Sequence, residues 1–96
     1  MIAIRKTELF TEWFQRLRDR QARARIQARI DRAELGNFGD CEPVDHGVSE
    51  MRIHYGPGYR VYFARRGEML VILLAGGTKK TQSKDIATAI DLALQL

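Results

Sequence analysis

The chain has 96 residues, of which 45% are hydrophobic and 29% charged, and it carries a formal net charge of +4. This length and composition are typical of one soluble globular domain, residues 1–96, with a single core and no room for a second domain. They also exclude a membrane span, because the longest apolar run, residues 69–75, is far shorter than the ~20 residues that a bilayer requires.

The basic charge favours a polyanionic partner, either a nucleic acid or an acidic protein. The single cysteine, Cys41, excludes an internal disulfide, and no cysteines and histidines have the spacing of metal ligands. We therefore expect neither a metal ion nor a cofactor. Charged, helix-forming sequence follows residues 1–6 directly, so we recognise no signal peptide and expect a cytoplasmic location.

The first part of the chain predicts a short strand and then a helix. Residues 2–5 alternate as a strand does, and Thr7 offers an N-cap ahead of the acidic Glu8. The helix carries an apolar stripe at three- and four-residue spacing, made of Leu9, Phe10, Trp13, Phe14 and Leu17. We expect Trp13 to lie in the core rather than to serve as an exposed platform for stacking bases.

A second helix is predicted between Asp19, its N-cap, and Gly36, the glycine that follows its end. Its buried stripe consists of Ala22, Ile26, Ile30 and Ala33. Many arginines decorate the two helices, namely Arg16, Arg18, Arg20, Arg23, Arg25, Arg29 and Arg32. We interpret this surface as a solvated helix face, and contact with phosphates or ribosomal RNA is the alternative interpretation.

Strands follow the two helices. Residues 37–47 form a predicted loop with a short strand near residues 43–45, and residues 68–74 form a near-continuous aliphatic strand. Short connections predict antiparallel pairing of the last three strands.

The segment Gly76-Gly77 lies between a strand and a helix, as phosphate-binding loops do, but it lacks the glycine directly before lysine that such loops require. We expect a turn with tight backbone packing there. The last helix is predicted to begin at Thr81 or Ser83. Its apolar stripe consists of Ile86, Ile90 and Ala93.

The hairpin of residues 51–63 is the most informative segment, because its side chains alternate strictly between two faces. The apolar face consists of Met51, Ile53, Tyr55, Tyr59, Val61 and Phe63. The opposite face presents Arg52, His54, Arg60 and Tyr62. A loop with an odd number of residues pairs polar side chains with polar ones and apolar side chains with apolar ones across the two strands. A three-residue loop, Gly56-Pro57-Gly58, places His54 opposite Arg60 and Arg52 opposite Tyr62.

The polar face of this hairpin suits the cleavage of RNA by its own 2′-hydroxyl. That reaction needs cations for the phosphate and groups that move protons. Arg52 and Arg60 supply guanidinium groups for the phosphate, and His54 can act as acid or base near neutral pH. Tyr62 can donate a proton or stack on a base. Lys79 and Lys80 extend the cationic wall from the end of the last strand.

Each of these residues also has a purely structural interpretation. Arg60 could pair with Glu50 or Asp85, and His54 could be an exposed cross-strand partner. The catalytic hypothesis requires Arg52, His54 and Arg60 to converge without being neutralised by carboxylates.

Two segments resemble the RelE/ParE toxin superfamily: the glycine-tyrosine-arginine motif at residues 58–60 and the Gly-Gly-Thr-Lys-Lys segment at residues 76–80. The runs at residues 36–40, 47–55 and 56–62 are similar to its HigB-type branch, the phage Gp49-like addiction module killer proteins. The resemblance covers nearly the whole chain.

This resemblance implies an α+β fold with two N-terminal helices packed on a mostly antiparallel sheet of about four strands, and a C-terminal helix. It implies a toxin that acts as a ribosome-dependent messenger RNA endonuclease, inhibits translation and is silenced by a cognate antitoxin. We expect that antitoxin to be a helix-turn-helix, HigA-like protein.

The resemblance also assigns roles to residues. It places phosphate stabilisation on Arg60, a basic strand residue at Arg52, and a basic pair at Lys79 and Lys80. RelE-like enzymes often carry a catalytic tyrosine or histidine near the C-terminus, and residues 83–96 contain neither. Acid and base duty would then move to His54, or to Tyr55 or Tyr62, and we include Tyr55 among the RNA-binding residues.

Two rival functions remain at this level. ParE-type toxins of the same fold inhibit DNA gyrase by binding alone, and a basic protein-binding module without toxicity is the third alternative.

Overall fold

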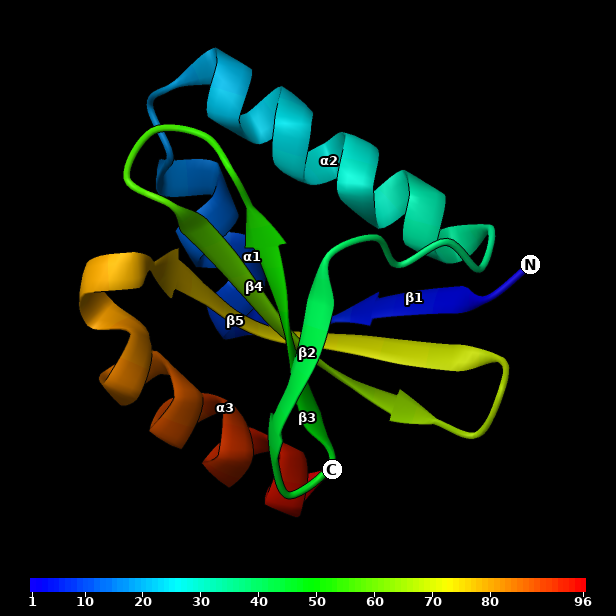
Figure 1. The fold of residues 1–96 in the computed structure, drawn as a ribbon. Coiled ribbons are helices and arrows are strands. Elements are labelled where there is room, and N and C mark those ends of the chain that lie inside the picture. The colour runs from blue at the N-terminus through cyan, green and yellow to red at the C-terminus, as the bar shows by residue number, and fades with distance from the viewer.

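The computed structural model describes residues 1–96 as an α+β fold with one five-stranded mixed sheet and three α-helices (Figure 1). Its elements are β1 (Ala3–Lys6), α1 (Glu8–Arg16), α2 (Arg20–Glu34), β2 (Cys41–Asp45), β3 (Val48–Ile53), β4 (Tyr59–Arg66), β5 (Leu70–Thr78), a 3-10 turn η1 (Lys79–Thr81) and α3 (Gln82–Gln95). The predicted fold class is confirmed, with five strands in place of about four. None of the helices combines the length and apolar character needed to cross a membrane.

The strands lie in the order β1-β5-β4-β3-β2, and only the β1–β5 pair is parallel. The antiparallel part follows from short connections between β2 and β5, as predicted. The parallel pair involves the first and last strands, so all the intervening elements provide the crossover that parallel neighbours need.

The predicted caps of the first two helices are confirmed by hydrogen bonds and backbone angles, whereas Thr81 stands at the N-cap of α3 without a capping hydrogen bond from its side chain. The Thr7 hydroxyl oxygen accepts from the Phe10 amide at 3.1 Å, and an Asp19 carboxylate oxygen accepts from the Gln21 amide at 2.9 Å. Gly36 has φ +95°, the left-handed conformation that ends many helices.

Helices cover both faces of the sheet, with α1 and α2 on one side and α3 on the other (Figure 1). The first core joins α1 and α2 to the sheet and contains Phe10, Ala22, Ile26, Ile30, Ala33, Met51, Ile53, Tyr59, Val61, Phe63, Val71 and Leu73. The second core joins α3 to the opposite face and contains Val48, Tyr62, Ala64, Leu74, Ala75, Ala89 and Ala93. The hairpin faces and the helix stripes predicted from the alternation and the three- to four-residue spacing therefore build these cores, with the exception of Leu9, which is exposed and belongs to neither core.

The Gly76-Gly77 segment is part of β5, so the predicted turn is wrong and the strand continues to Thr78. The predicted tight packing is confirmed. A Cβ atom at Gly76 would collide with the indole of Trp13, and one at Gly77 would collide with the carboxylate of Asp85. The glycines let α1 and α3 approach the strand closely from its two faces.

The hairpin has an odd loop, as predicted, but the loop comprises five residues, 54–58, rather than three. Arg52 lies opposite Arg60, and Glu50 lies opposite Tyr62, so the predicted pairing is displaced by two residues. A displacement of two leaves every side chain on its face, which is why the alternation could not detect it. The longer loop closes on itself, because the Gly58 amide donates to the Tyr55 carbonyl at 3.1 Å.

Candidate functional site

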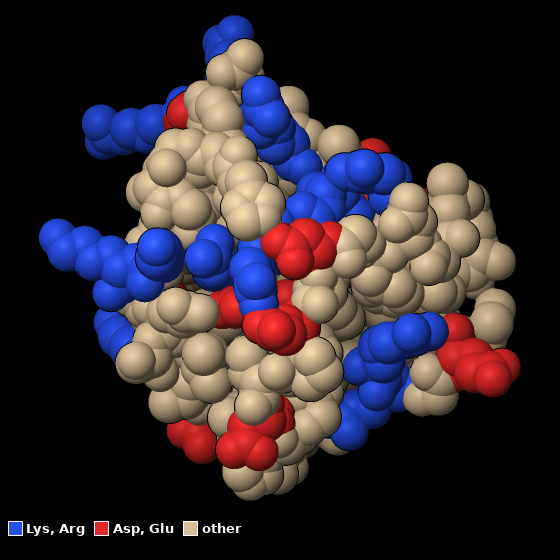
Figure 2. Space-filling model, in the orientation of Figure 1, with Lys and Arg blue, Asp and Glu red and all other residues tan.

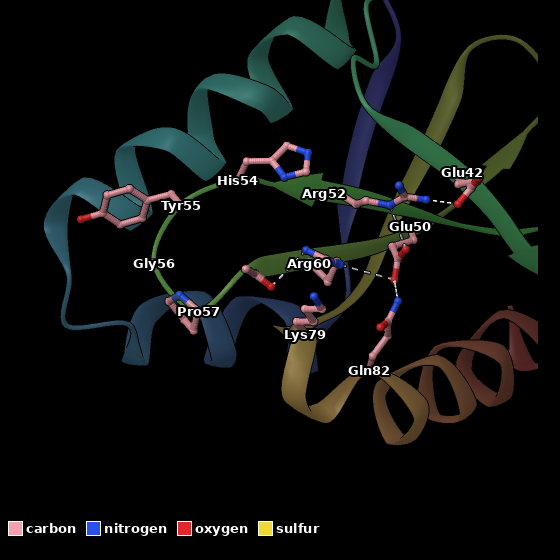
Figure 3. A pocket seen from close by; sticks show the side chains of 11 residues that line it. Glu42, Glu50, Arg52, His54, Tyr55, Gly56, Pro57, Arg60, Lys79 and Gln82 are labelled. Carbon is pink, nitrogen blue, oxygen red and sulfur yellow. Dashed lines mark hydrogen bonds and ion pairs between the residues drawn. The ribbon is translucent and has the colours of Figure 1, made fainter.

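An open pocket of about 610 Å³ lies where the β3–β4 hairpin meets η1 and the start of α3 (Figure 3). The residues that line it are Glu42, Glu50, Arg52, His54, Tyr55, Gly56, Pro57, Gly58, Arg60, Lys79 and Gln82. The structure therefore brings together five of the predicted site residues, which are Arg52, His54, Tyr55, Arg60 and Lys79. Lys80 is exposed and does not line the pocket, and Tyr62 lies beneath α3.

Glu50 is the buried centre of this pocket, with 3% of its surface exposed. One of its oxygens accepts from Gln82 Nε2 at 2.5 Å and from the Tyr62 hydroxyl at 3.4 Å. The other accepts from Arg52 Nε at 3.3 Å. The carboxylate also lies 3.6 Å from Arg60 Nε. It thus lies between two arginines that face each other across the strands, an arrangement that would be destabilising without an anion.

Arg60 is held against the hairpin loop. Its Nη1 donates to the carbonyl oxygens of Gly58 at 3.2 Å and Tyr59 at 3.3 Å, while its buried Nε has no hydrogen-bond partner. The Gly58 carbonyl also accepts from the Lys79 amide at 2.8 Å. This shared carbonyl places Lys79 beside Arg60, as Figure 3 shows.

Arg52 is neutralised more fully than the sequence interpretation allowed. It forms ion pairs with Glu42 and Glu50, and its Nη1 lies 3.9 Å from Asp40. The expectation that Arg52, His54 and Arg60 would be free of carboxylates is wrong, because each of the three forms an ion pair with one. Arg60 pairs with Glu50, as its structural interpretation predicted, whereas Asp85 accepts from Thr81 instead.

His54 projects from the hairpin loop, and 72% of its side chain is exposed. Its Nε2 lies 2.6 Å from an Asp40 carboxylate oxygen, and this hydrogen bond lowers the pKa of Asp40. Arg29 holds the segment that carries Asp40, because its guanidinium donates to the carbonyl oxygens of Phe38 and Asp40 and to that of Arg52. The partner of His54 is thus Asp40 rather than Arg60.

Tyr55 points from the loop toward α2 (Figure 3). Its hydroxyl donates to Asp19 at 2.8 Å and to Gln21 at 3.0 Å, and the guanidinium of Arg25 lies 4.8 Å from its ring centre. The hydrogen bond to Asp19 raises the pKa of Tyr55 and lowers that of Asp19. Tyr55 therefore ties the hairpin loop to the start of α2.

Tyr62 is fully buried, so the expectation that it meets RNA is wrong. It has the predicted orientation, away from the α1–α2 core, but α3 covers that part of the sheet. Burial raises the pKa of its phenol. Its hydroxyl approaches Glu50 and thereby helps to position that carboxylate.

Four residues of this site were missed as functional candidates: Asp40, Glu42, Glu50 and Gln82. Glu50 lies two residues before Arg52, so the alternation of the strand already placed both side chains on the same face. Nothing in the spacing places Asp40, Glu42 or Gln82 at the hairpin. No group of three or more His, Cys, Asp or Glu side chains in the structure could hold a metal ion.

Residues 12–96 match the family described as phage derived protein Gp49-like (DUF891). A protein of Haemophilus influenzae (strain ATCC 51907 / DSM 11121 / KW20 / Rd), described as an uncharacterized protein, is 48% identical over 95 residues, which cover 99% of this chain and 96% of the relative. No solved structure matches the chain. The chain therefore belongs to the Gp49-like family of phage-derived proteins, which is a family of RelE/HigB-like toxins.

Proposed function

We propose that this protein is the toxin of a type II toxin–antitoxin module and cleaves messenger RNA on the ribosome without a metal ion. The observation that carries the proposal is the convergence of Arg60, His54 and Lys79 on one open pocket. The family supports the toxin class, and the pocket supports the chemistry.

The cations of this pocket act on the phosphate. Arg60 Nη2 makes no hydrogen bond within the protein, and Lys79 is exposed beside it. These two groups offset the negative charge that grows on the phosphate oxygens as the 2′-oxygen attacks phosphorus and the bond to the 5′-oxygen breaks. Glu50 acts as a positioning residue, because its carboxylate already accepts from Gln82 and Arg52.

His54 moves the proton in this scheme. Asp40 engages Nε2 and fixes the ring, which leaves Nδ1 to take the proton of the 2′-hydroxyl. Water in the open pocket protonates the leaving 5′-oxygen. The buried Tyr62 takes no part in contact with RNA.

The test compares the two histidines of the chain, because each is exposed and each pairs with an aspartate. His54 pairs with Asp40 and His46 with Asp45. On ribosomes programmed with a defined message, His54→Gln lowers the cleavage rate by about a hundredfold or more, whereas His46→Gln cleaves as the wild type does. Prior treatment of the toxin with a chelator, followed by dialysis, leaves the rate unchanged. Equal rates for the two variants would sink the proposal.

Inhibition of DNA gyrase by binding is the second candidate, and the neutralisation of Arg52 favours it. Three carboxylates lie around that guanidinium, which reduces the cationic surface available to RNA. A gyrase supercoiling assay separates the two functions. Supercoiling unaffected by the wild-type protein, together with message cleavage, supports the nuclease.

The antitoxin partner is proposed to be a helix-turn-helix protein that covers the basic surface of the toxin. Co-expression with the product of an adjacent small reading frame should restore growth. Growth arrest that persists under co-expression with each neighbouring reading frame contradicts this assignment.

A further inference from the structure

A second pocket, of about 400 Å³, lies between α2 and the end of β3. It is lined by Arg25, Ala28, Arg29, Arg32, Ile53 and His54. The three arginines recur at spacings of four and three residues, so one face of α2 directs them to the same side. His54 lines this pocket and also the first one, which makes the two pockets neighbours across the histidine.

The electrostatics of the second pocket differ from those of the first. No carboxylate lines it, whereas Glu42 and Glu50 line the first. None of its three arginines forms an ion pair, because the ion-paired cations of this protein are His46, Arg52, His54 and Arg60. Figure 2 shows basic side chains over the region of α2 and acidic side chains mixed with basic ones nearer the centre of the same face. The second pocket is thus the less neutralised of the two.

The three arginines have different environments. Arg29 is fixed, because its guanidinium donates to backbone carbonyls, including that of Arg52 at 2.5 Å. Arg25 stacks on Tyr55, and Arg32 is exposed and makes no side-chain hydrogen bond. Arg25 and Arg32 therefore retain their donors for a ligand, while Arg29 forms a rigid cationic wall. Guanidinium groups of this kind suit phosphate oxygens.

We propose that the second pocket binds a phosphate of single-stranded RNA next to the one held by Arg60, so that the RNA backbone crosses His54 between two phosphate sites. This inference rests on the proposed nuclease function and extends it with a binding subsite on α2. An RNA strand fits better than an acidic peptide, because its phosphates recur regularly and both pockets adjoin the residue proposed to move the proton. The arginine-rich helix face is then a binding surface rather than only a solvated one.

The test measures binding of fluorescent, 2′-O-methyl RNA, which cannot undergo the cleavage step, by anisotropy at several salt concentrations. The probes are a dinucleotide, whose single internucleotide phosphate can occupy only one of the two sites, and an oligonucleotide of about eight nucleotides, a length within the usual range of single-strand sites. The variant is Arg25→Gln/Arg32→Gln. Its matched control is Arg5→Gln/Lys6→Gln, which removes the same charge from exposed residues of β1, at the sheet edge opposite β2 and β3.

We expect the α2 variant to bind the longer RNA roughly tenfold more weakly, since hydrogen bonds to charged groups are worth about that factor or more. Its salt dependence should fall by about 0.7 in log–log slope, since the second pocket holds one phosphate and each single-strand phosphate contact contributes about that amount. The α2 variant should bind the dinucleotide about as well as the wild type does, and the control variant should show little change with either probe. Circular dichroism checks that the helices of the variant are intact.

Equal weakening of the longer RNA by the α2 variant and the β1 control would overturn the subsite. A competition experiment could also overturn it. If a polyglutamate peptide displaces the RNA from the wild type at a lower concentration of charges than unlabelled RNA does, and fails to do so with the α2 variant, the pocket is assigned to an acidic protein. Two further outcomes separate this inference from the proposed function. If the wild type cleaves ribosome-bound message but the α2 variant binds the oligonucleotide as the wild type does, the subsite is rejected and the nuclease is kept. If the α2 variant selectively loses RNA binding but the wild type does not cleave, the subsite is kept and the nuclease is rejected.

Discussion

One face of the sheet has two ends that differ sharply, although the same strands build both. At the covered end, Val48, Tyr62 and Ala64 pack against α3. At the open end, only two residues farther along β3 and β4, Glu50, Arg52 and Arg60 form the wall of a pocket. In β3 and β4 the alternation of side chains between the two faces is unbroken from one end to the other. The difference therefore comes from α3, which covers only part of the face.

The boundary between the two ends lies at a cross-strand pair, Glu50 and Tyr62. Gln82, the first residue of α3, donates to Glu50 at the same place. The buried carboxylate of Glu50 is stabilised there because it contacts arginines on the open side and neutral hydrogen-bond donors on the covered side. In this sheet, the start of α3 decides where the core ends and the pocket begins.

The largest expected effect is at the covered end. Tyr62→Ala removes a fully buried aromatic ring and should lower the free energy of unfolding by about 4 kcal/mol, within the range for aromatic side chains replaced by alanine in cores. Lys79→Ala, at the open end, should change it by less than about 0.5 kcal/mol, because the side chain is exposed. Urea titration of both variants measures the difference. Comparable losses would mean that α3 does not separate the two ends.

The second prediction concerns the boundary. Glu50→Ala leaves Arg52 and Arg60 facing each other without their shared carboxylate, and we expect a loss of about 3 kcal/mol in the free energy of unfolding. Glu42→Ala removes another ion-pair partner of Arg52, but that carboxylate is exposed, so its loss should cost less than about 1 kcal/mol. Both variants are compared by urea titration at moderate salt. A Glu50 variant as stable as the Glu42 variant would contradict the role of Glu50 as the buried centre.

The covered end was largely predictable from sequence, because local patterns set its parts. Thr7 and Asp19 mark helix starts by their capping chemistry, and Gly36 marks a helix end. The faces of the hairpin followed from alternation. The exposure of Tyr62 did not, since alternation gives the direction of a side chain and says nothing about a helix that arrives from a later segment.

The open end was predictable only as a set of residue types. The parity of Arg52 and Arg60 correctly placed them on one face, but their direct opposition depends on a loop length that parity does not fix. Asp40 reaches His54 because Arg29 of α2 anchors the intervening loop, a contact between distant segments. Such contacts have no periodic signal, so the neutralisation of the site became visible only in three dimensions.

The third prediction uses alkaline pH to probe the covered end. Because burial raises the pKa of Tyr62, the folded protein keeps a phenol proton that the unfolded chain loses above pH ~10. The unfolded state then binds fewer protons, and the free energy of unfolding falls as pH rises, by at most about 1.4 kcal/mol per pH unit from this group. Tyr62→Phe should show a shallower decline in urea titrations above that pH. An identical decline in wild type and variant would place the effect elsewhere.

The smallest expected effect is a loss of stability in acid that arises at the open end. The hydrogen bond from His54 lowers the pKa of Asp40 below its usual 3.8, so its stabilising contribution is present above that value and is lost as pH falls through the lowered pKa. Asp40→Asn should therefore be less stable than the wild type near neutral pH, and the gap should narrow in acid. Asp91→Asn, which makes the same replacement at an exposed position of α3, is the matched control. Because Asp40 is exposed, added salt should shrink the neutral-pH gap, and a gap that widens in acid would mean that the Asp40–His54 pair does not stabilise the loop.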